Sequence, residues 1–269
     1  MGRELFERFP DWTAAADEVL GYSIRELCLE DPRGELGRTE FTQPALYVVS
    51  ALAWRARLED GKPRPDFVAG HSLGEYNALL AAAVFDFATG LRLVKARGAI
   101  MGQVTGGGMA AVVGLEPRRI EEVLAGSDAG RRLDVANFNA FDQTVIAGPL
   151  EDIEAVRGDF QAAGVRAFTP LKVSAPFHSR YMKAPMEAFR AVLDQADLRA
   201  PVLPVVANVT AAPYQAGETL DTLGRQIGSS VRWLDSMTWL LDRGVTDFEE
   251  VGPGNVLTKL IGRIRKARG

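Results

Sequence analysis

The sequence predicts an α/β fold: a large part with a mostly parallel sheet between helices, and a smaller β-α-β-β-α-β part inserted into it. Two observations predict this arrangement. Short apolar strand candidates alternate with helical segments on both sides of the middle of the chain, which is typical of a parallel sheet covered on both faces. Residues 107–173 instead follow the strand and helix order of a ferredoxin-like unit. We therefore expect a large subdomain over residues 1–105 and 175–269 and a small subdomain over residues 106–174.

The N-terminal elements are predicted mainly from helical periodicity. Residues 1–61 are expected to be helical, and Thr42-Gln43-Pro44 is typical of a helix start because proline fits the first turn. Apolar residues at helical spacing continue through residues 45–58. The elements expected next are a buried strand over residues 66–69, a helix over residues 75–83 and a second helix from about Asp86.

Gly106-Gly107-Gly108 opens the insert. No strand candidate precedes these glycines and no Lys-Ser/Thr pair follows them, so they do not fit a phosphate-binding loop, and we expect a hinge. The elements expected in the insert are strands over residues 109–115, 133–138, 144–147 and 165–173, and helices over residues 117–124 and 150–163. Those expected after it are a helix over residues 182–196 and strands over residues 204–209 and 246–251, with a structural turn at Gly252-Pro253-Gly254.

Composition and charge exclude several classes of protein. The chain has 269 residues, of which 47% are hydrophobic and 25% charged, as expected for a globular protein with a sizeable core. Its net charge of −4 gives no electrostatic case for binding nucleic acid. The most apolar stretch, residues 78–85, is too short to cross a bilayer, and charges interrupt the N-terminus, so we expect no membrane span and no signal peptide. The single cysteine, Cys28, cannot form an internal disulfide, which suits a cytoplasmic protein.

Gly70-His71-Ser72-Leu73-Gly74 fits the G-x-S-x-G pattern of a nucleophile elbow. The flanking glycines allow a sharp turn from the preceding strand into the following helix, which holds the Ser72 hydroxyl out at the tip. This context favours a nucleophilic Ser72. The alternative is a serine that caps a helix in a glycine-rich turn.

A nucleophilic serine usually needs a base, and histidine is the usual one. The chain has only two histidines, His71 and His178. The side chain of His71 would point away from its neighbour Ser72 at a sharp turn. His178, in Ser174-Ala175-Pro176-Phe177-His178-Ser179, is therefore the candidate base; the alternative is a histidine with no special task.

Arg97 lies in the middle of an apolar helix face. At about 100° per residue, this face collects Phe87, Leu91, Leu93, Val94, Ile100 and Met101. A buried guanidinium must find an anion because an unpaired buried charge is very costly. Periodicity leaves two partners open: a carboxylate of this chain, or a substrate carboxylate held by parallel hydrogen bonds.

Three segments together carry a resemblance. They are the Gly-His-Ser-Leu-Gly-Glu-Tyr run around Ser72, Lys95-Ala96-Arg97-Gly98 and Ala175-Pro176-Phe177-His178-Ser179. On these segments the chain resembles the malonyl-CoA:acyl carrier protein transacylase family. The similarity continues along nearly the whole chain through Thr42-Gln43-Pro44-Ala45, Ala136-Asn137-Phe138-Asn139, Val206-Ala207-Asn208-Val209 and Glu250-Val251-Gly252-Pro253-Gly254. Glu75-Tyr76-Asn77-Ala78-Leu79 is most similar to free-standing acyltransferases that serve modular polyketide synthases.

The resemblance implies an α/β-hydrolase-like large domain with a ferredoxin-like insert, and a ping-pong reaction. The serine at Ser72 would be acylated by malonyl-CoA, and the phosphopantetheine thiol of an acyl carrier protein would then take the malonyl group for fatty-acid or polyketide synthesis. The histidine at His178 would act as general base and then as general acid. The Leu73 backbone N–H, at a helix start, is expected to stabilise the oxyanion. No metal or redox cofactor is implied, and we expect a monomer.

Further site residues are implied by the same resemblance. The arginine at Arg97 would bind the malonyl carboxylate, and His71 is also expected to contact the substrate. Phe177 is similar to the malonyl-selective form, because its bulk leaves little room for a 2-methyl branch. The backbone carbonyl of Gln226 would orient the histidine, and Ser230 stands where the family usually has proline.

The family usually begins with a buried strand and Gly-Gln-Gly-Ser-Gln, whose glutamine lies by the oxyanion hole. The sequence given starts at Met1-Gly2-Arg3-Glu4-Leu5, which matches the helix after that motif. We expect either that the native chain carries an upstream segment with this motif, which the intact remainder favours, or that this form has lost part of its site and stability.

Four more residues are noted near the expected site. Asn137 and Asn139 either shape it or are turn and strand-end residues with local hydrogen bonds. Glu75 is expected to be a surface residue that complements the helix dipole. Gln43 is expected to approach the site.

Other functions remain open. An acyl hydrolase would use the same serine and histidine but deliver water, and Arg97 argues against it; a non-catalytic docking protein is the second alternative. A general esterase needs an acid between serine and histidine in chain order. The candidates for this acid are Asp134 and Asp142, and both lie within the insert. Carrier docking would need a basic patch, for which Arg180 and Lys183 are candidates unless they are ordinary solvated charges.

Overall fold

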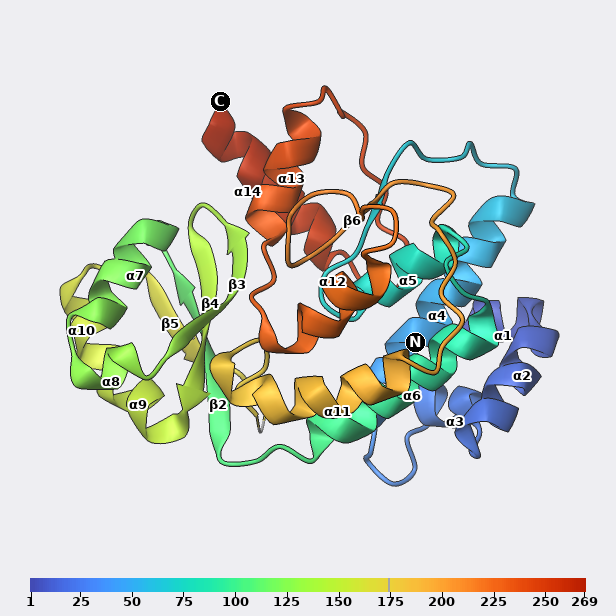
Figure 1. The fold of residues 1–269 in the computed structure, drawn as a ribbon, viewed down its shortest axis with the longest axis horizontal. Helices are drawn as coiled ribbons and strands as arrows, with labels where there is room; N and C mark the ends of the chain where they lie inside the picture. Colours follow the sequence, from blue (N-terminus) through green and yellow to red (C-terminus); the bar gives the residue numbers. More distant parts are fainter. Residues whose placement is uncertain (174) are drawn as a thin grey trace.

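A computed structural model describes residues 1–173 and 175–269. Ser174, the first residue of the segment around His178, lies outside the described residues. Two sheets of different kinds organise the chain (Figure 1). The antiparallel sheet, which has four strands, forms one end of the molecule with its helices, and the N-terminal helices form the opposite end. The structure and its neighbours confirm the predicted α/β fold with a parallel and a separate antiparallel sheet.

The chain contains the following elements in order, with η marking short 3-10 helices: α1 (Arg3–Arg8), α2 (Pro10–Leu20), α3 (Ile24–Leu29), α4 (Thr39–Glu59), β1 (Val68–Ala69), α5 (Gly74–Ala81), α6 (Phe87–Gly102), β2 (Gly107–Val113), α7 (Pro117–Ala125), α8 (Asp128–Arg131), β3 (Asp134–Ala140), β4 (Gln143–Pro149), α9 (Leu150–Ala155), α10 (Arg157–Ala162), β5 (Ala167–Pro170), η1 (Arg180–Met182), α11 (Lys183–Leu193), β6 (Val205–Val206), α12 (Thr219–Arg225), η2 (Gln226–Gly228), α13 (Trp233–Leu241) and α14 (Val256–Arg268). None of the helices in the described ranges is long and apolar enough to cross a membrane.

The parallel sheet is short. Its strands β1 and β6 pair in parallel, with Val68 opposite Val205. The strand expected at residues 246–251 is wrong: this segment joins no ladder in the described chain. Its polar groups are used by α14 instead, because the Glu250 carboxylate accepts the Thr258 N–H at 2.8 Å near the start of that helix.

The antiparallel sheet has the strand order β3-β4-β2-β5, which is the order of a ferredoxin-like unit. Helices α7 and α9 pack on it through a small core in which Ile120, Ile153 and Phe160 are buried. The helix expected over residues 150–163 is divided into α9 and α10 at Val156.

Gly107 and Gly108 do not form the expected hinge, because both lie in strand β2. A Cβ at Gly107 would lie 2.6 Å from Pro176, and one at Gly108 would lie 2.5 Å from Leu150. Close packing therefore explains these two glycines. Only Gly106 has the positive φ, 84°, that a glycine readily adopts.

The main core lies between α4 and α6, where Tyr47, Leu52 and Leu91 are fully buried. Helix α4 begins at Thr39, three residues before the expected start, so Pro44 lies inside it and removes one backbone hydrogen-bond donor from its first turns. Helix α6 begins beside Asp86, where a helix start was expected; Asp86 is its N-cap, and its carboxylate accepts the Thr89 N–H at 2.7 Å.

Candidate active site

Ser72 lies in a sharp turn between β1 and α5. Its φ of 50° is left-handed, a conformation that costs free energy in a residue with a Cβ. Asn208, two residues beyond β6, offsets this cost: its side chain accepts the Ser72 N–H at 2.7 Å and donates to the Gly70 carbonyl at 2.6 Å. A Cβ at Gly70 would lie 2.0 Å from the backbone of Gly74, so the turn requires glycine. The Ser72 side chain does not cap α5, whose N-cap position is Leu73.

His178 faces the nucleophile. Its Nε2 lies 2.7 Å from Ser72 Oγ, and its Nδ1 lies 3.0 Å from the carbonyl of Gln226 and 3.1 Å from that of Ser229. Carbonyls only accept, so Nδ1 carries the proton and Nε2 presents its lone pair to the serine hydroxyl. The sequence did not indicate the Ser229 contact, because every residue type offers a carbonyl.

Burial lowers the pKa of His178 to about 3, and the nearby Arg97 guanidinium adds to this effect. The imidazole is therefore neutral near pH 7 and free to accept a proton. The chain's other histidine is occupied elsewhere: His71 Nε2 lies 2.8 Å from Asn139 Oδ1, and its ring centroid lies 5.6 Å from that of Trp233.

Lowering the pH from about 6.5 to about 4.5 is expected to cost the His178→Gln variant less folding free energy than the parent protein. The pKa of His178 is about 3 when folded and 6.5 ordinarily, so within this window only the unfolded chain binds the extra proton. Above pH 6.5 the titration of His178 costs no folding free energy. Below pH 6.5 it lowers the free energy of unfolding by up to about 1.4 kcal/mol per pH unit. Urea unfolding of both proteins across this range measures the difference; equal losses would contradict it.

Arg97 is buried beside the nucleophile, with 1% of its surface exposed. Its guanidinium donates to Gln43 Oε1 at 2.6 Å, Gln226 Oε1 at 3.1 Å and Ser72 Oγ at 3.2 Å. All three acceptors are neutral, and within residues 1–173 and 175–269 no carboxylate lies within 4 Å of it. The first of the two partners considered for Arg97, a carboxylate of this chain, is thus not in contact with it. Burial lowers the pKa of Arg97.

Glu75 is fully buried, so the expected surface position is wrong. Its carboxylate accepts the Tyr214 hydroxyl at 2.6 Å, the Asn208 N–H at 3.2 Å and the Gln226 side-chain N–H at 2.5 Å. Burial raises the pKa of Glu75 to about 7. These hydrogen bonds explain how a charged residue can occupy this face of α5. No periodic pattern around Glu75 indicates these contacts, because the three donors come from distant segments.

The remaining expected residues surround this centre. No hydrogen bond in the described part of the chain uses the Leu73 N–H, which follows the nucleophile at the start of α5. Phe177 is half-buried and packs between the main core and a small cluster that includes Met109. Gln43 approaches the site, as expected, through Arg97. Asn137 is buried in β3 and forms a backbone bridge with Val231.

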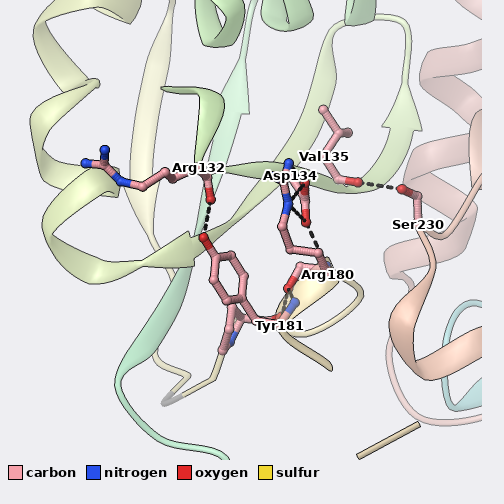
Figure 2. A network of polar contacts seen from close by, with 8 residues as sticks. Arg132, Asp134, Val135, Arg180, Tyr181 and Ser230 are labelled. Atoms are coloured by element: carbon pink, nitrogen blue, oxygen red, sulfur yellow. Dashed lines mark hydrogen bonds and ion pairs between the residues drawn. The ribbon is translucent and has the colours of Figure 1, made fainter. Parts of the chain in front are cut away.

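A pocket of about 610 Å³ opens beside His178, between the small sheet and η2. Polar contacts join the two sides of this region (Figure 2). The Arg180 guanidinium binds Asp134 at 2.8 Å, the Tyr181 hydroxyl donates to the Arg132 carbonyl at 2.7 Å, and the Ser230 hydroxyl donates to the Val135 carbonyl at 2.6 Å. These contacts hold strand β3 against the segments that carry and orient His178.

The two carboxylates offered for an esterase are engaged elsewhere. Asp134 binds Arg180, and Asp142 binds Arg166 at 2.8 Å. His178 Nδ1 faces backbone carbonyls instead of a carboxylate. This arrangement leaves the esterase without the acid that its triad requires.

Comparisons with known proteins agree on one family. A family model described as an acyl transferase domain matches residues 1–263. The polyketide biosynthesis malonyl CoA-acyl carrier protein transacylase BaeC of Bacillus velezensis is 49% identical over 266 residues, which is 98% of this chain and 92% of BaeC. The polyketide biosynthesis protein PksE of Bacillus subtilis is also 49% identical over 98% of this chain, but the chain spans only 35% of PksE.

A solved structure is similar along the whole chain. The crystal structure of a malonyl CoA-acyl carrier protein transacylase from Burkholderia pseudomallei has a TM-score of 0.95 and 49% identity. The match covers 99% of this chain and 93% of that one.

Proposed function

The chain belongs to the family of acyl transferase domains, and we propose that it transfers a malonyl group from malonyl-CoA to the phosphopantetheine thiol of an acyl carrier protein. One observation carries the choice of acyl group: a buried Arg97, with no carboxylate of the described chain in contact, donates a hydrogen bond to the Ser72 hydroxyl. A guanidinium in that position provides the binding site for a carboxylate attached to the acyl group that Ser72 receives.

The acylation step uses the Ser72–His178 pair. His178 Nε2 takes the hydroxyl proton as Ser72 Oγ attacks the thioester carbonyl. The Leu73 N–H serves as one donor to the oxyanion. Collapse of the tetrahedral intermediate breaks the carbon–sulfur bond, and the imidazolium returns its proton to the leaving CoA thiolate.

The malonyl carboxylate assists this base. Arg97 is one of the causes that lower the pKa of His178, and an ion pair between Arg97 and the malonyl carboxylate offsets its charge. The pKa of His178 therefore rises when the correct acyl group is bound. In the second half-reaction His178 takes the proton of the carrier thiol as the sulfur attacks the carbonyl of malonyl-Ser72. The ester bond to Ser72 Oγ then breaks, and the imidazolium returns the proton to Ser72 Oγ, which restores the free serine and the neutral histidine. Every proton transfer has a protein group, so the proposal requires no metal or redox cofactor.

Substrate selection and partners complete the proposal. Phe177 limits the acyl pocket to a malonyl group without a 2-methyl branch, and His71 contributes to substrate binding. Gln226 orients His178 through its carbonyl. The enzyme acts as a cytoplasmic monomer, and the name of BaeC favours carrier proteins of polyketide biosynthesis as partners. The Asp134 carboxylate paired with Arg180 offsets the positive charge of this arginine, so Lys183 is the better candidate for carrier docking.

The proposed division of the chain places the nucleophile and the base in one subdomain. Residues 106–174 form the small subdomain, and residues 1–105 with 175–269 form the large one. The small subdomain meets the base through the contacts of Asp134 and Val135.

The proposal is tested by measuring intact-protein mass after brief incubation with malonyl-CoA, beside acetyl-CoA, followed by addition of a carrier protein bearing phosphopantetheine. The parent protein is expected to gain a malonyl group and pass it to the carrier, and Ser72→Ala is expected to gain none. Loss of the adduct to water before the carrier is added would favour the hydrolase. A folded protein that forms no adduct would favour the docking protein.

A further inference from the structure

Glu75 lies outside the groups that would touch substrate, yet its hydrogen-bond partners connect it to two of them, Ser72 and Arg97. One carboxylate oxygen, Oε1, accepts from Tyr214 and from the backbone of Asn208, whose side chain holds the elbow. The other oxygen, Oε2, accepts the Gln226 side-chain N–H at 2.5 Å. Gln226 in turn contacts Arg97 and Ser72. All of Glu75 is buried, so water does not replace these contacts.

The Gln226 amide has only one orientation that satisfies its surroundings. Its Nε2 donates to Glu75 and to the Ser72 carbonyl at 2.9 Å, and its Oε1 accepts from Arg97 at 3.1 Å. A flipped amide would place its oxygen against the carboxylate and its NH₂ against the guanidinium, which repels at both ends. Above its pKa of about 7 the Glu75 carboxylate is charged, so it then accepts a stronger hydrogen bond from the Gln226 NH₂ than the neutral Ser72 carbonyl does.

We propose that Glu75 is a positioning residue for malonyl selection: its carboxylate fixes the Gln226 amide so that Arg97 Nη2 is held next to Ser72 Oγ. This inference rests on the proposed transacylase function. A malonyl group uses Arg97 and an acetyl group does not, so loss of the Glu75–Gln226 contact lowers malonylation far more than acetylation.

The test compares Glu75→Gln with Tyr214→Phe. A glutamine at position 75 cannot accept from both Gln226 and the Asn208 N–H without turning its own NH₂ toward one of these donors. Tyr214→Phe is the matched control, because it removes a buried hydrogen bond from the same carboxylate and leaves the Gln226 contact in place. We expect Glu75→Gln to lower the ratio of malonylation to acetylation rate constants about tenfold, and Tyr214→Phe to change this ratio less than about twofold.

A purely structural role gives a different result. It would lower both rate constants and the Tm in both variants with the ratio unchanged, and this outcome would overturn the proposal. A double variant with Gln226→Ala adds a second criterion: once the amide is absent, Glu75→Gln should no longer change the ratio. If Glu75→Gln does not fold, Glu75→Asp replaces it. Aspartate keeps the charge but is too short to reach Gln226, so a ratio unchanged from the parent would also overturn the proposal.

A crystal structure of the Glu75→Gln variant separates this inference from the proposed function. We expect the Gln226 side chain to leave hydrogen-bond distance of Arg97, which requires no acyl donor to observe. An unchanged Gln226–Arg97 contact would refute the positioning role even if the parent protein is a transacylase. A parent protein that forms no malonyl adduct would refute the function and leave the structural criterion to decide the role of Glu75.

Discussion

Replacing His178 with alanine is expected to lower the rate constant of Ser72 malonylation by about 10³- to 10⁴-fold. The imidazole is the only titratable group described at hydrogen-bond distance from Ser72 Oγ that can accept a proton, since Arg97 only donates. Without it, the serine must attack as an alcohol, and the leaving thiolate has no acid beside it. Rapid-quench sampling followed by intact-protein mass measurement gives the rate constant directly.

His71→Ala is the comparison variant for this prediction. It removes the chain's other histidine, next to the nucleophile in sequence, but its ring contacts Asn139 and Trp233. We expect a loss of at most about tenfold, from altered substrate binding rather than from proton transfer. Equal losses in the two histidine variants would show that His178 is not the base.

Replacing Arg97 with alanine is expected to reverse the preference for malonyl-CoA over acetyl-CoA. Malonylation should fall by about 100-fold, because the acyl carboxylate loses a charge-assisted partner worth roughly 3 kcal/mol in a buried site. Acetylation should be unchanged or faster, since the variant no longer holds a buried cation whose hydrogen-bond partners are all neutral. Rate constants with both donors, measured under identical conditions, provide the ratio.

The Tm of Arg97→Ala and the acyl selectivity of Arg97→Lys provide the controls for this prediction. Arg97 has neutral partners at all three of its hydrogen bonds, so Arg97→Ala removes a buried charge as well as packing, and the Tm should fall by less than for a core aliphatic residue. Arg97→Lys keeps the charge but not the planar fork, and should retain an intermediate preference for malonyl-CoA. An unchanged preference in Arg97→Ala would exclude the guanidinium as the carboxylate site.

Local patterns predicted most of the fold. The insert was predictable because each of its strands and helices has a clear period and its strand order follows from a common antiparallel unit. The segment 246–251 was not, because a strand exists only when another backbone pairs with it, and Glu250 and Thr246 bond to α14. Gly107 and Gly108 look like flexible chain in sequence, but the side chains that exclude a Cβ there come from Pro176 and Leu150.

The candidate site was predictable at residues whose type or motif is rare in this chain, and not at residues of common types. A chain with two histidines and one G-x-S-x-G pattern leaves few ways to pair Ser72 with a base. Arg97 was visible because a cation interrupts an apolar helix face. Asn208 and Tyr214 have no such contrast with their neighbours, and their roles arise only from contacts between distant segments. Glu75 was placed at the surface because a carboxylate in a first helical turn usually needs no partner other than the helix dipole.

The antiparallel sheet also changes how easily the chain can bring its two reactive groups together. Ser72 and His178 are separated by 106 positions, and closing a loop of that length reduces chain entropy. The Leu171 N–H donates to the Met109 carbonyl at 2.8 Å. The chain therefore leaves the antiparallel sheet beside the point at which it enters it. Once the sheet has formed, the residues between Met109 and Leu171 no longer lengthen the loop, and the entropic cost of joining nucleophile and base falls by roughly 0.8 kcal/mol. Early folding of the sheet would therefore speed assembly of the site, and a cut within it would slow assembly without removing any reacting group.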